Sequence, residues 1–331
     1  MRGSVIGLAV VAPFVVGLAV TPGAPHGSQV MRFEDPAIVE ASDLVVRDGL
    51  FVTTNDSGDT GRVFVVDREG RTVGVTHWSD APTDVEALAP AGPGAVWVGD
   101  IGDNLGHRPD VTITRVPVGR GDRTVQPTSY RLSYPGGARD AETLVRNPRT
   151  GRLYIASKNV FGGALYAVPR HLRADRVNPL TRTGRVLPMA TDGAFFPDGK
   201  HLVVRGYGSA IVYDWPSLQP VANFDLPSQR QGEGIAVTPD GSLYLSSEGA
   251  RSPVLRFALP GDVRRAMSPT SSSPSSSPPS PSSAPSSASA DPAAPPAVEP
   301  ASTSTDVWPW ALGGIVIVGA ILVLLRSLRP R

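Results

Sequence analysis

Carboxylates recur at one place in a repeated segment, where their types and spacing could bind a metal ion. The segments "DVE" at 84–86 and "DAE" at 140–142 each place two acidic residues just before an apolar strand. Carboxylates held close together must either take up protons or be balanced by a cation. Calcium suits such ligands because it accepts about six to eight oxygens at irregular angles. The predicted calcium ligands are Asp84, Glu86, Asp140, Glu142, Asp192, Glu233, Asp100 and Asp103.

Two glycine-rich acidic loops, "NDSGD" at 55–59 and "GDIGDN" at 99–104, follow the next strands of their segments. Their glycines would let backbone carbonyls turn toward an ion. Asp and Asn at strand ends also stabilise turns by bonding nearby backbone amides, so both interpretations stay open. Lys158, Arg205 and Tyr207 occupy the equivalent loops of later segments. We expect these three residues to contact an anionic substrate, or else to neutralise the acidic loops.

Composition excludes several classes of site. The chain has 31 basic and 30 acidic residues and a net charge of +1, which argues against a nucleic-acid partner. It has no cysteine, so disulfides and thiolate metal sites are impossible. Its 5 histidines show no zinc-ligand spacing. Neither a G-x-S-x-G motif nor a phosphate-binding P-loop is present.

The elements that position these residues form a repeat of four short strands. Successive copies begin at intervals of 44, 56, 50 and 41 residues, which is typical of β-propeller blades. We therefore predict an all-β propeller over residues 29–265, with five blades favoured and a sixth possible within the long second interval. The strand at 29–35 is expected to close the ring in the last blade. The residues in register at the start of each copy are Ser42, Glu86, Glu142, Asp192 and Glu233.

Strand direction predicts where the acidic residues meet. In an antiparallel blade the first strand begins and the second strand ends on the same face. The Pro-Asp-Gly hairpins at 197–199 and 239–241 then lie on the opposite face. First strands line the axis of a propeller, so we expect the carboxylates to gather at one mouth of a central channel.

The two ends of the chain predict attachment to a membrane. Residues 1–28 contain an apolar run typical of a signal peptide or an uncleaved N-terminal anchor. Residues 266–305 are rich in Ser and Pro and predict a disordered linker. The uncharged stretch 307–325 has the length of a transmembrane helix, and the arginine-rich tail 326–331 is expected in the cytoplasm. The propeller would then be extracellular at the cell membrane.

Several motifs add a family resemblance. "TNDSGD", "GDIGDN", "TDGAFFPDG" and "QGEGIAVTPDGSLYLSSEG" resemble secreted or membrane-anchored actinobacterial propellers of the phytase-like group, also loosely described as WD40-repeat proteins. That group carries the label "esterase-like activity of phytase". The D-x-E pairs are also similar to motifs of calcium-dependent alkaline phytases, propellers that hydrolyse phosphate esters at a calcium-lined mouth. The resemblance implies calcium ligands at Asp84, Glu86, Asp140, Glu142 and Glu233.

Two functions follow as hypotheses. The first is a surface-anchored propeller whose acidic, calcium-binding mouth holds a ligand or a partner in the cell envelope. The second is a calcium-dependent hydrolase of phosphoesters, with a phosphorylated small molecule as its substrate.

Overall fold

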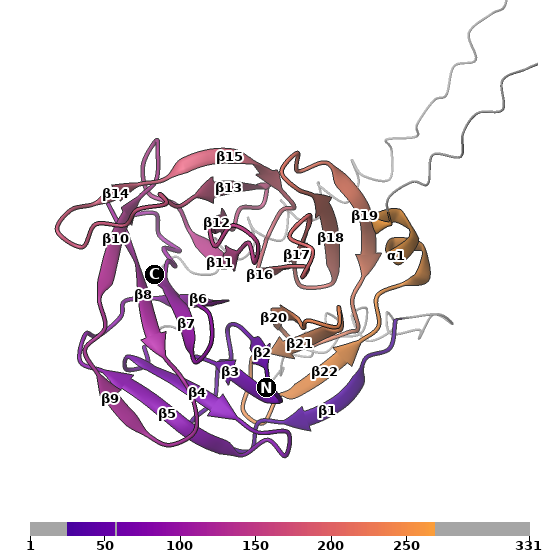
Figure 1. The fold of residues 1–331 in the computed structure, drawn as a ribbon, viewed down its shortest axis with the longest axis horizontal. Coiled ribbons are helices and arrows are strands. Elements are labelled where there is room, and N and C mark those ends of the chain that lie inside the picture. Colours follow the sequence, from indigo (N-terminus) through magenta and orange to yellow (C-terminus); the bar gives the residue numbers. More distant parts are fainter. Residues whose placement is uncertain (1–24, 57, 269–331) are drawn as a thin grey trace, which may run out of the picture. The chain divides into compact units, whose positions relative to one another are not determined.

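Five small β-sheets surround one axis in the computed structural model, which describes residues 25–56 and 58–268 (Figure 1). The first blade contains β2 (Val45–Arg47), β3 (Leu50–Thr53), β4 (Arg62–Val66) and β5 (Thr72–Trp78). The second contains β6 (Val85–Pro90), β7 (Ala95–Asp100), β8 (Val111–Pro117) and β10 (Ser129–Ser133). The third contains β11 (Ala141–Arg146), β12 (Leu153–Ser157), β13 (Gly163–Ala167) and β15 (Thr181–Val186). The fourth contains β16 (Asp192–Phe195), β17 (His201–Arg205), β18 (Ser209–Asp214) and β19 (Pro220–Asp225).

The fifth blade confirms the predicted closure by the N-terminal strand. It contains β20 (Gly232–Val237), β21 (Leu243–Ser247), β22 (Pro253–Phe257) and β1 (Ser28–Arg32). Because β1 pairs with β22, the first strand of the chain completes the last blade at its outer edge (Figure 1). The pairing removes an open strand edge and ties the two ends of the ring together.

The prediction of a possible sixth blade is wrong, because the long second interval adds only the short edge strand β9, and the third interval adds a similar strand, β14. β9 (Arg123–Val125) pairs in parallel with β5 of the first blade. β14 (Asn178–Pro179) pairs in the same way with β10 of the second blade. Each extra strand comes from the blade that follows, so it links neighbouring blades along their outer edges.

The core consists of five apolar clusters, one in each space between adjacent blades. Successive residues of a strand point to opposite faces, so each blade supplies side chains to both neighbours. On β11, for example, Leu144 packs toward the second blade and Val145 toward the fourth. The blades are thus buried on both faces, and this packing fixes the position of their inner strands.

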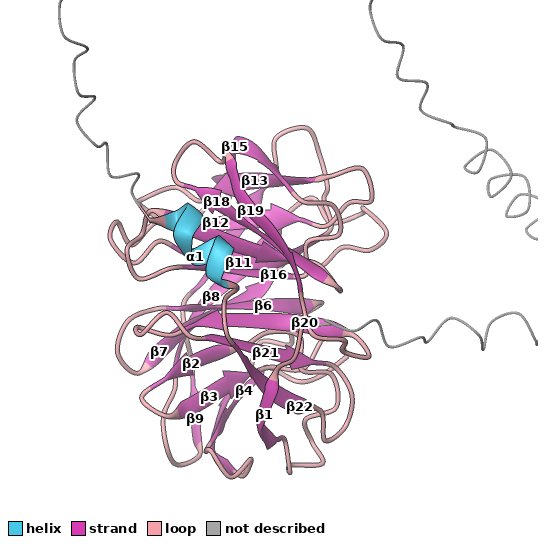
Figure 2. Cartoon of the chain, turned by 90° about the vertical axis from the view of Figure 1, so that its right-hand side faces the viewer, coloured by secondary structure: helices cyan, strands magenta, loops and turns pink. Residues whose placement is uncertain are grey.

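The inner strands β2, β6, β11, β16 and β20 contact one another in that order around the axis and line a central channel. The short helix α1 (Gly261–Met267) lies beside β19 at the outside of the ring (Figures 1 and 2). Within residues 25–56 and 58–268, no helix is both long and apolar enough to span a membrane. Most of the predicted signal peptide or anchor, most of the linker, and the predicted span and tail at 307–331 lie outside the described residues.

Candidate metal site in the channel mouth

Three buried glutamates stand at irregularities of the inner strands. The pairing register shifts at Glu86 between β6 and β7, and at Glu142 between β11 and β12. A third shift, between β20 and β21, spans Glu233. A β-bulge leaves one residue out of the ladder and re-aims its side chain, and bulges are common next to functional sites. The bulges therefore turn three glutamates, from three different blades, toward the channel.

These glutamates belong to a continuous acidic ring, defined here as Asp56, Asp84, Glu86, Glu142, Glu233 and Glu248. Burial raises the pKa of Glu86 to about 11, and the charges of Asp56 and Glu142 add to the effect. Burial and the charge of Glu248 raise the pKa of Glu233 to about 7. The pKa of Glu248 is raised by its burial and then by Asp56, which closes the ring electrostatically. The charged forms of Glu86, Glu233 and Glu248 are therefore disfavoured by burial and by neighbouring negative charge.

The tightest part of the acidic ring joins the first two blades. Carboxylate oxygens of Asp56, Asp84 and Glu86 all lie within 4.8 Å of one another. Calcium binds oxygen at about 2.4 Å, so two ligands on opposite sides of the ion are about 4.8 Å apart. Burial and the charges of Asp56 and Asp140 raise the pKa of Asp84 to about 6. The spacing therefore fits three ligands of one hard cation.

Gly102 gives this cluster the space that it needs. A Cβ atom at this position would lie 2.4 Å from Oδ2 of Asp84 and 2.8 Å from Cγ of Glu86. The backbone of the "GDIGDN" loop thus packs directly against both members of the D-x-E pair. The loop also bonds the same segment, since the Gly102 N–H donates to the Asp84 carbonyl at 3.1 Å.

One cation faces the acidic ring from the third blade. Lys158 Nζ forms an ion pair with Oε1 of Glu142 and lies 5.4 Å from the ring centre of Tyr207. Burial alone would lower the Lys158 pKa, but the bond to Glu142 outweighs it and holds the pKa above its usual range. Burial still raises the pKa of Glu142 to about 8, despite the lysine. Oε2 of Glu142 is buried and has no hydrogen-bond partner among the described residues.

Asp100 and Asp103, both predicted metal ligands, are engaged in shaping the "GDIGDN" loop. Asp100 accepts hydrogen bonds from the backbone N–H groups of Thr83 and Asp84, at 3.1 and 2.9 Å, and pairs with Arg108 at 2.9 Å. Asp103 accepts the N–H groups of His107 and Arg108, both at 2.9 Å. Asp140 supports the same loop by accepting the Asp103 N–H at 3.0 Å. These three carboxylates position the D-x-E segment of the second blade, so the structure favours the turn-stabilising interpretation for them.

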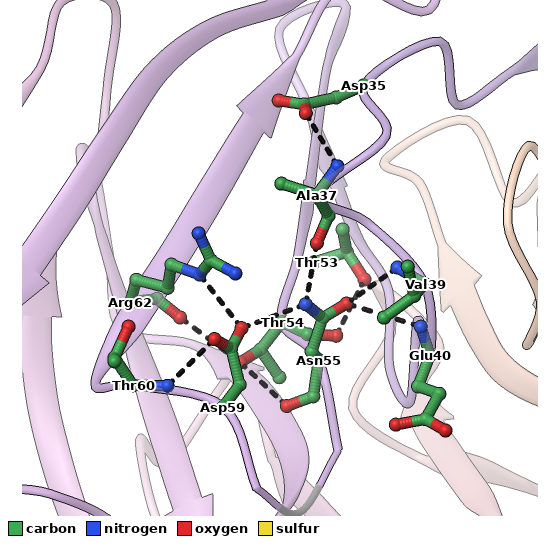
Figure 3. A network of polar contacts seen from close by, with 10 residues as sticks. All are labelled: Asp35, Ala37, Val39, Glu40, Thr53, Thr54, Asn55, Asp59, Thr60 and Arg62. Carbon is green, nitrogen blue, oxygen red and sulfur yellow. Dashed lines mark hydrogen bonds and ion pairs between the residues drawn. The ribbon is translucent and has the colours of Figure 1, made fainter.

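In the "NDSGD" loop, Asn55 and Asp59 belong to a network of polar contacts with neighbouring residues (Figure 3). Asn55 Oδ1 accepts the N–H groups of Val39 and Glu40, and its Nδ2 donates to the Ala37 carbonyl at 2.8 Å. Asp59 accepts hydrogen bonds from Asn55, Thr60 and Arg62 at 2.7 to 2.8 Å. Asn55 and Asp59 therefore brace the loop, while Asp56 between them joins the acidic ring.

Asp192 lies below the acidic ring rather than in it. Its Oδ2 accepts the Ile235 N–H at 2.6 Å and its Oδ1 accepts the Gly193 N–H at 2.5 Å. Its carboxyl also meets that of Asp43, which accepts the N–H groups of Leu44 and Leu88. Burial, and then the charge of Asp43, raise the Asp192 pKa well above its usual value, so the protonated form of the pair is favoured. We therefore replace the predicted metal role of Asp192 with that of a buried acid pair.

Arg205 is also placed differently from the expectation. Its side chain is fully buried and donates to the carbonyl groups of Gly206, Tyr207 and Gly234 and to the side chain of Gln229, at 3.0 to 3.2 Å. Burial lowers its pKa to about 10, and it stays protonated at neutral pH. The guanidinium ties the fourth blade to the fifth, so we no longer assign it to a ligand.

Asp43, which forms the buried acid pair with Asp192, was not predicted from the sequence. The missed signal for Asp43 is its match to Asp192, since Ser42-Asp43 and Thr191-Asp192 both precede an apolar run. Aligning Ser42 with Asp192 concealed this match by one residue. Lys158 and Tyr207 do face the acidic ring, and their predicted contact with an anionic ligand stays a prediction.

Comparison with known proteins finds solved structures of low similarity. No protein-family model matches the chain, and no curated protein matches it either. A solved structure described as glucose dehydrogenase is 14% identical, with a TM-score of 0.43, over 71% of this chain and 100% of that one. Hydrazine synthase of Kuenenia stuttgartiensis is 15% identical, with a TM-score of 0.38, over 71% of this chain and 59% of that one. A second glucose dehydrogenase is 13% identical, with a TM-score of 0.39, over 67% and 83%.

Proposed function

We propose that the propeller binds one calcium ion at Asp56, Asp84 and Glu86 and uses the charged mouth to hold an anionic ligand. The carrying observation is that oxygens of these three side chains lie within 4.8 Å of one another. Burial and mutual repulsion raise the pKa values of Asp84 and Glu86, so a bound cation would relieve an unfavourable arrangement. Backbone carbonyls and water would complete the coordination.

The ligand would lie between the ion and the third blade. Lys158 supplies a positive charge at the edge of the acidic ring, and Tyr207 beside it is 39% exposed. An anionic group could therefore bridge the calcium ion and the lysine. In keeping with the predicted C-terminal span, the partner would be a component of the cell envelope.

Calorimetry of the full-length protein tests the metal site. Calcium chloride titrated into protein freed of metal by chelation should give saturable one-site binding. Asp56→Asn and Glu86→Gln should each weaken it at least tenfold, because each removes a charged ligand. Glu69→Gln, at an exposed acid on a hairpin of the first blade, is the matched control and should bind as the parent does. Equal calcium binding by parent and Glu86→Gln would reject the site.

Hydrolysis of a phosphoester is the second candidate, and the state of Glu233 favours it. Its pKa of about 7 lets this carboxyl group exchange a proton near neutral pH, as a general base must. A calcium ion would polarise the phosphoryl group, and Lys158 would offset charge on the phosphate oxygens. Release of phosphate from a panel of phosphomonoesters, with calcium and then with chelator, tests this candidate. Calcium binding without turnover would leave the binding function and remove the hydrolase.

A further inference from the structure

We propose that the opposite half of the central channel is a second binding site, which takes a small amphiphilic anion. A cavity of about 270 Å³ lies there, and every inner strand contributes to its wall. It is called the lower pocket here. Its volume is close to the lower end of the range for small-molecule sites, about 300 Å³.

The wall of the lower pocket is apolar and begins two residues beyond the mouth. Leu88, Leu144 and Ile235 line it, and each follows a glutamate of the acidic ring by two positions along its strand. The buried acid pair separates the two halves, because its members bond the backbone N–H groups of Leu88 and Ile235. The acid pair therefore lies between the acidic ring and the apolar wall, and the lower pocket is distinct from the mouth.

The rim combines proline with positive charge. Four exposed prolines lie there, one from each of the last four blades: Pro90, Pro148, Pro197 and Pro239. Proline offers no N–H donor and little flexibility, so the prolines form a stiff apolar collar. Arg47 and Arg146 are the charged residues of the lining, and no acidic side chain belongs to it within the described part of the chain.

Both arginines are available to an anion. Arg47 lies 3.5 Å from Asp48 in an exposed pair, which is weakly held. The Arg146 side chain makes no ion pair with any residue that the structure describes. A ligand with an apolar chain would pack against the apolar wall inside the collar. Its acidic head group would pair with the guanidinium groups of Arg47 and Arg146. The shared chemistry is that of an alkyl carboxylate or an alkyl phosphate.

Calorimetry of the full-length protein with decanoate and, separately, decyl phosphate tests the inference, and the two arms distinguish the head groups. We expect saturable one-to-one binding with a negative heat-capacity change for at least one of them. The double variant Arg47→Gln/Arg146→Gln should bind about tenfold more weakly. Arg173→Gln/Arg176→Gln, at exposed arginines of the third blade, is the matched control and should leave binding unchanged.

A blocking variant separates this cavity from nonspecific adsorption. Ala194 lies in the pocket wall and is partly exposed, so Ala194→Leu should fill the space and abolish binding while the melting temperature stays near that of the parent. Decyltrimethylammonium, which carries the opposite charge, should bind more weakly than either anion. The proposal would be overturned if the cation binds as tightly as the anions or if binding survives Ala194→Leu. It would also be overturned if neither anion shows saturable binding.

Discussion

The two halves of the central channel share the inner strands β6, β11 and β20 and have opposite chemistry. Within two residues, Glu86 gives way to Leu88 and Glu142 to Leu144. The mouth concentrates carboxylates that burial and repulsion keep from ionising easily, whereas the lower pocket is apolar with two arginines at its rim. The same strands therefore carry both halves, and the chemistry of each half depends on the residue type at that position along the strand.

The boundary between the halves should give the largest effect. Asp192→Ala removes the acceptor of the Gly193 and Ile235 N–H groups and leaves Asp43 buried beside a void. Each unsatisfied buried group costs about 1 to 3 kcal/mol, so we expect the free energy of unfolding to fall by about 3 kcal/mol or more. Urea unfolding followed by fluorescence measures this change. Asp192→Asn, which keeps an acceptor and removes an ionisable group, should lose much less, and equal losses would contradict the role of the pair.

The mouth can be disturbed without changing a charge. Gly102→Ala would place a methyl group against Asp84 and Glu86, so the carboxylates must move. We expect a loss of stability of about 1 to 3 kcal/mol from overpacking and calcium affinity at least tenfold lower. Thermal melting and calorimetry measure the two effects. Gly208→Ala is the control, because a Cβ atom there meets nothing within 4 Å. Unchanged calcium binding in Gly102→Ala would place the ion elsewhere.

The sequence predicted the architecture better than the chemistry of single residues. Repeated strands, hairpin turns and an unpaired first strand specify five blades and the closure by β1, because these features depend on local pattern. The edge strands β9 and β14 were missed, since segments of 3 and 2 residues carry no periodicity. The bulges at Glu86 and Glu142 and the burial of Arg205 were also missed, because they depend on packing between blades. Asp192 was misplaced for the same reason.

Calcium should stabilise the protein more strongly at high pH. The pKa values of the proposed ligands Asp84 and Glu86 are raised to about 6 and 11, so protons compete with the ion for their oxygens. At pH 5 the protonated carboxyls should bind calcium weakly, and the shift in melting temperature should be small. At pH 8 a concentration 100 times the Kd should add about 2.7 kcal/mol. A calcium-induced shift that is equal at both pH values would contradict carboxylate ligands of this kind.

Without calcium, stability should fall as the pH rises. The native pKa values of Glu233 and Glu142, about 7 and 8, lie above those of an unfolded chain, which are about 4. The folded protein then binds protons more tightly than the unfolded chain, so stability is fully present below about pH 4 and is lost as the pH rises through 8. Melting temperatures in chelator across this range measure the slope. Glu233→Gln should flatten it, whereas a slope that steepens in this variant would reject the assignment.

The rim of the lower pocket should give the smallest effect on stability, and this contrast sharpens the comparison. Arg47 has 46% of its side chain exposed, and its partner Asp48 has 87%, so the pair contributes little to folding. Arg47→Gln should change the free energy of unfolding by less than about 0.5 kcal/mol. Lys158→Gln in the mouth should cost about 1 kcal/mol or more, because it leaves Glu142 buried without its partner. Urea unfolding of both variants measures the two losses. An equal loss of unfolding free energy would contradict the contrast between the buried ion pair of the mouth and the exposed ion pair of the rim.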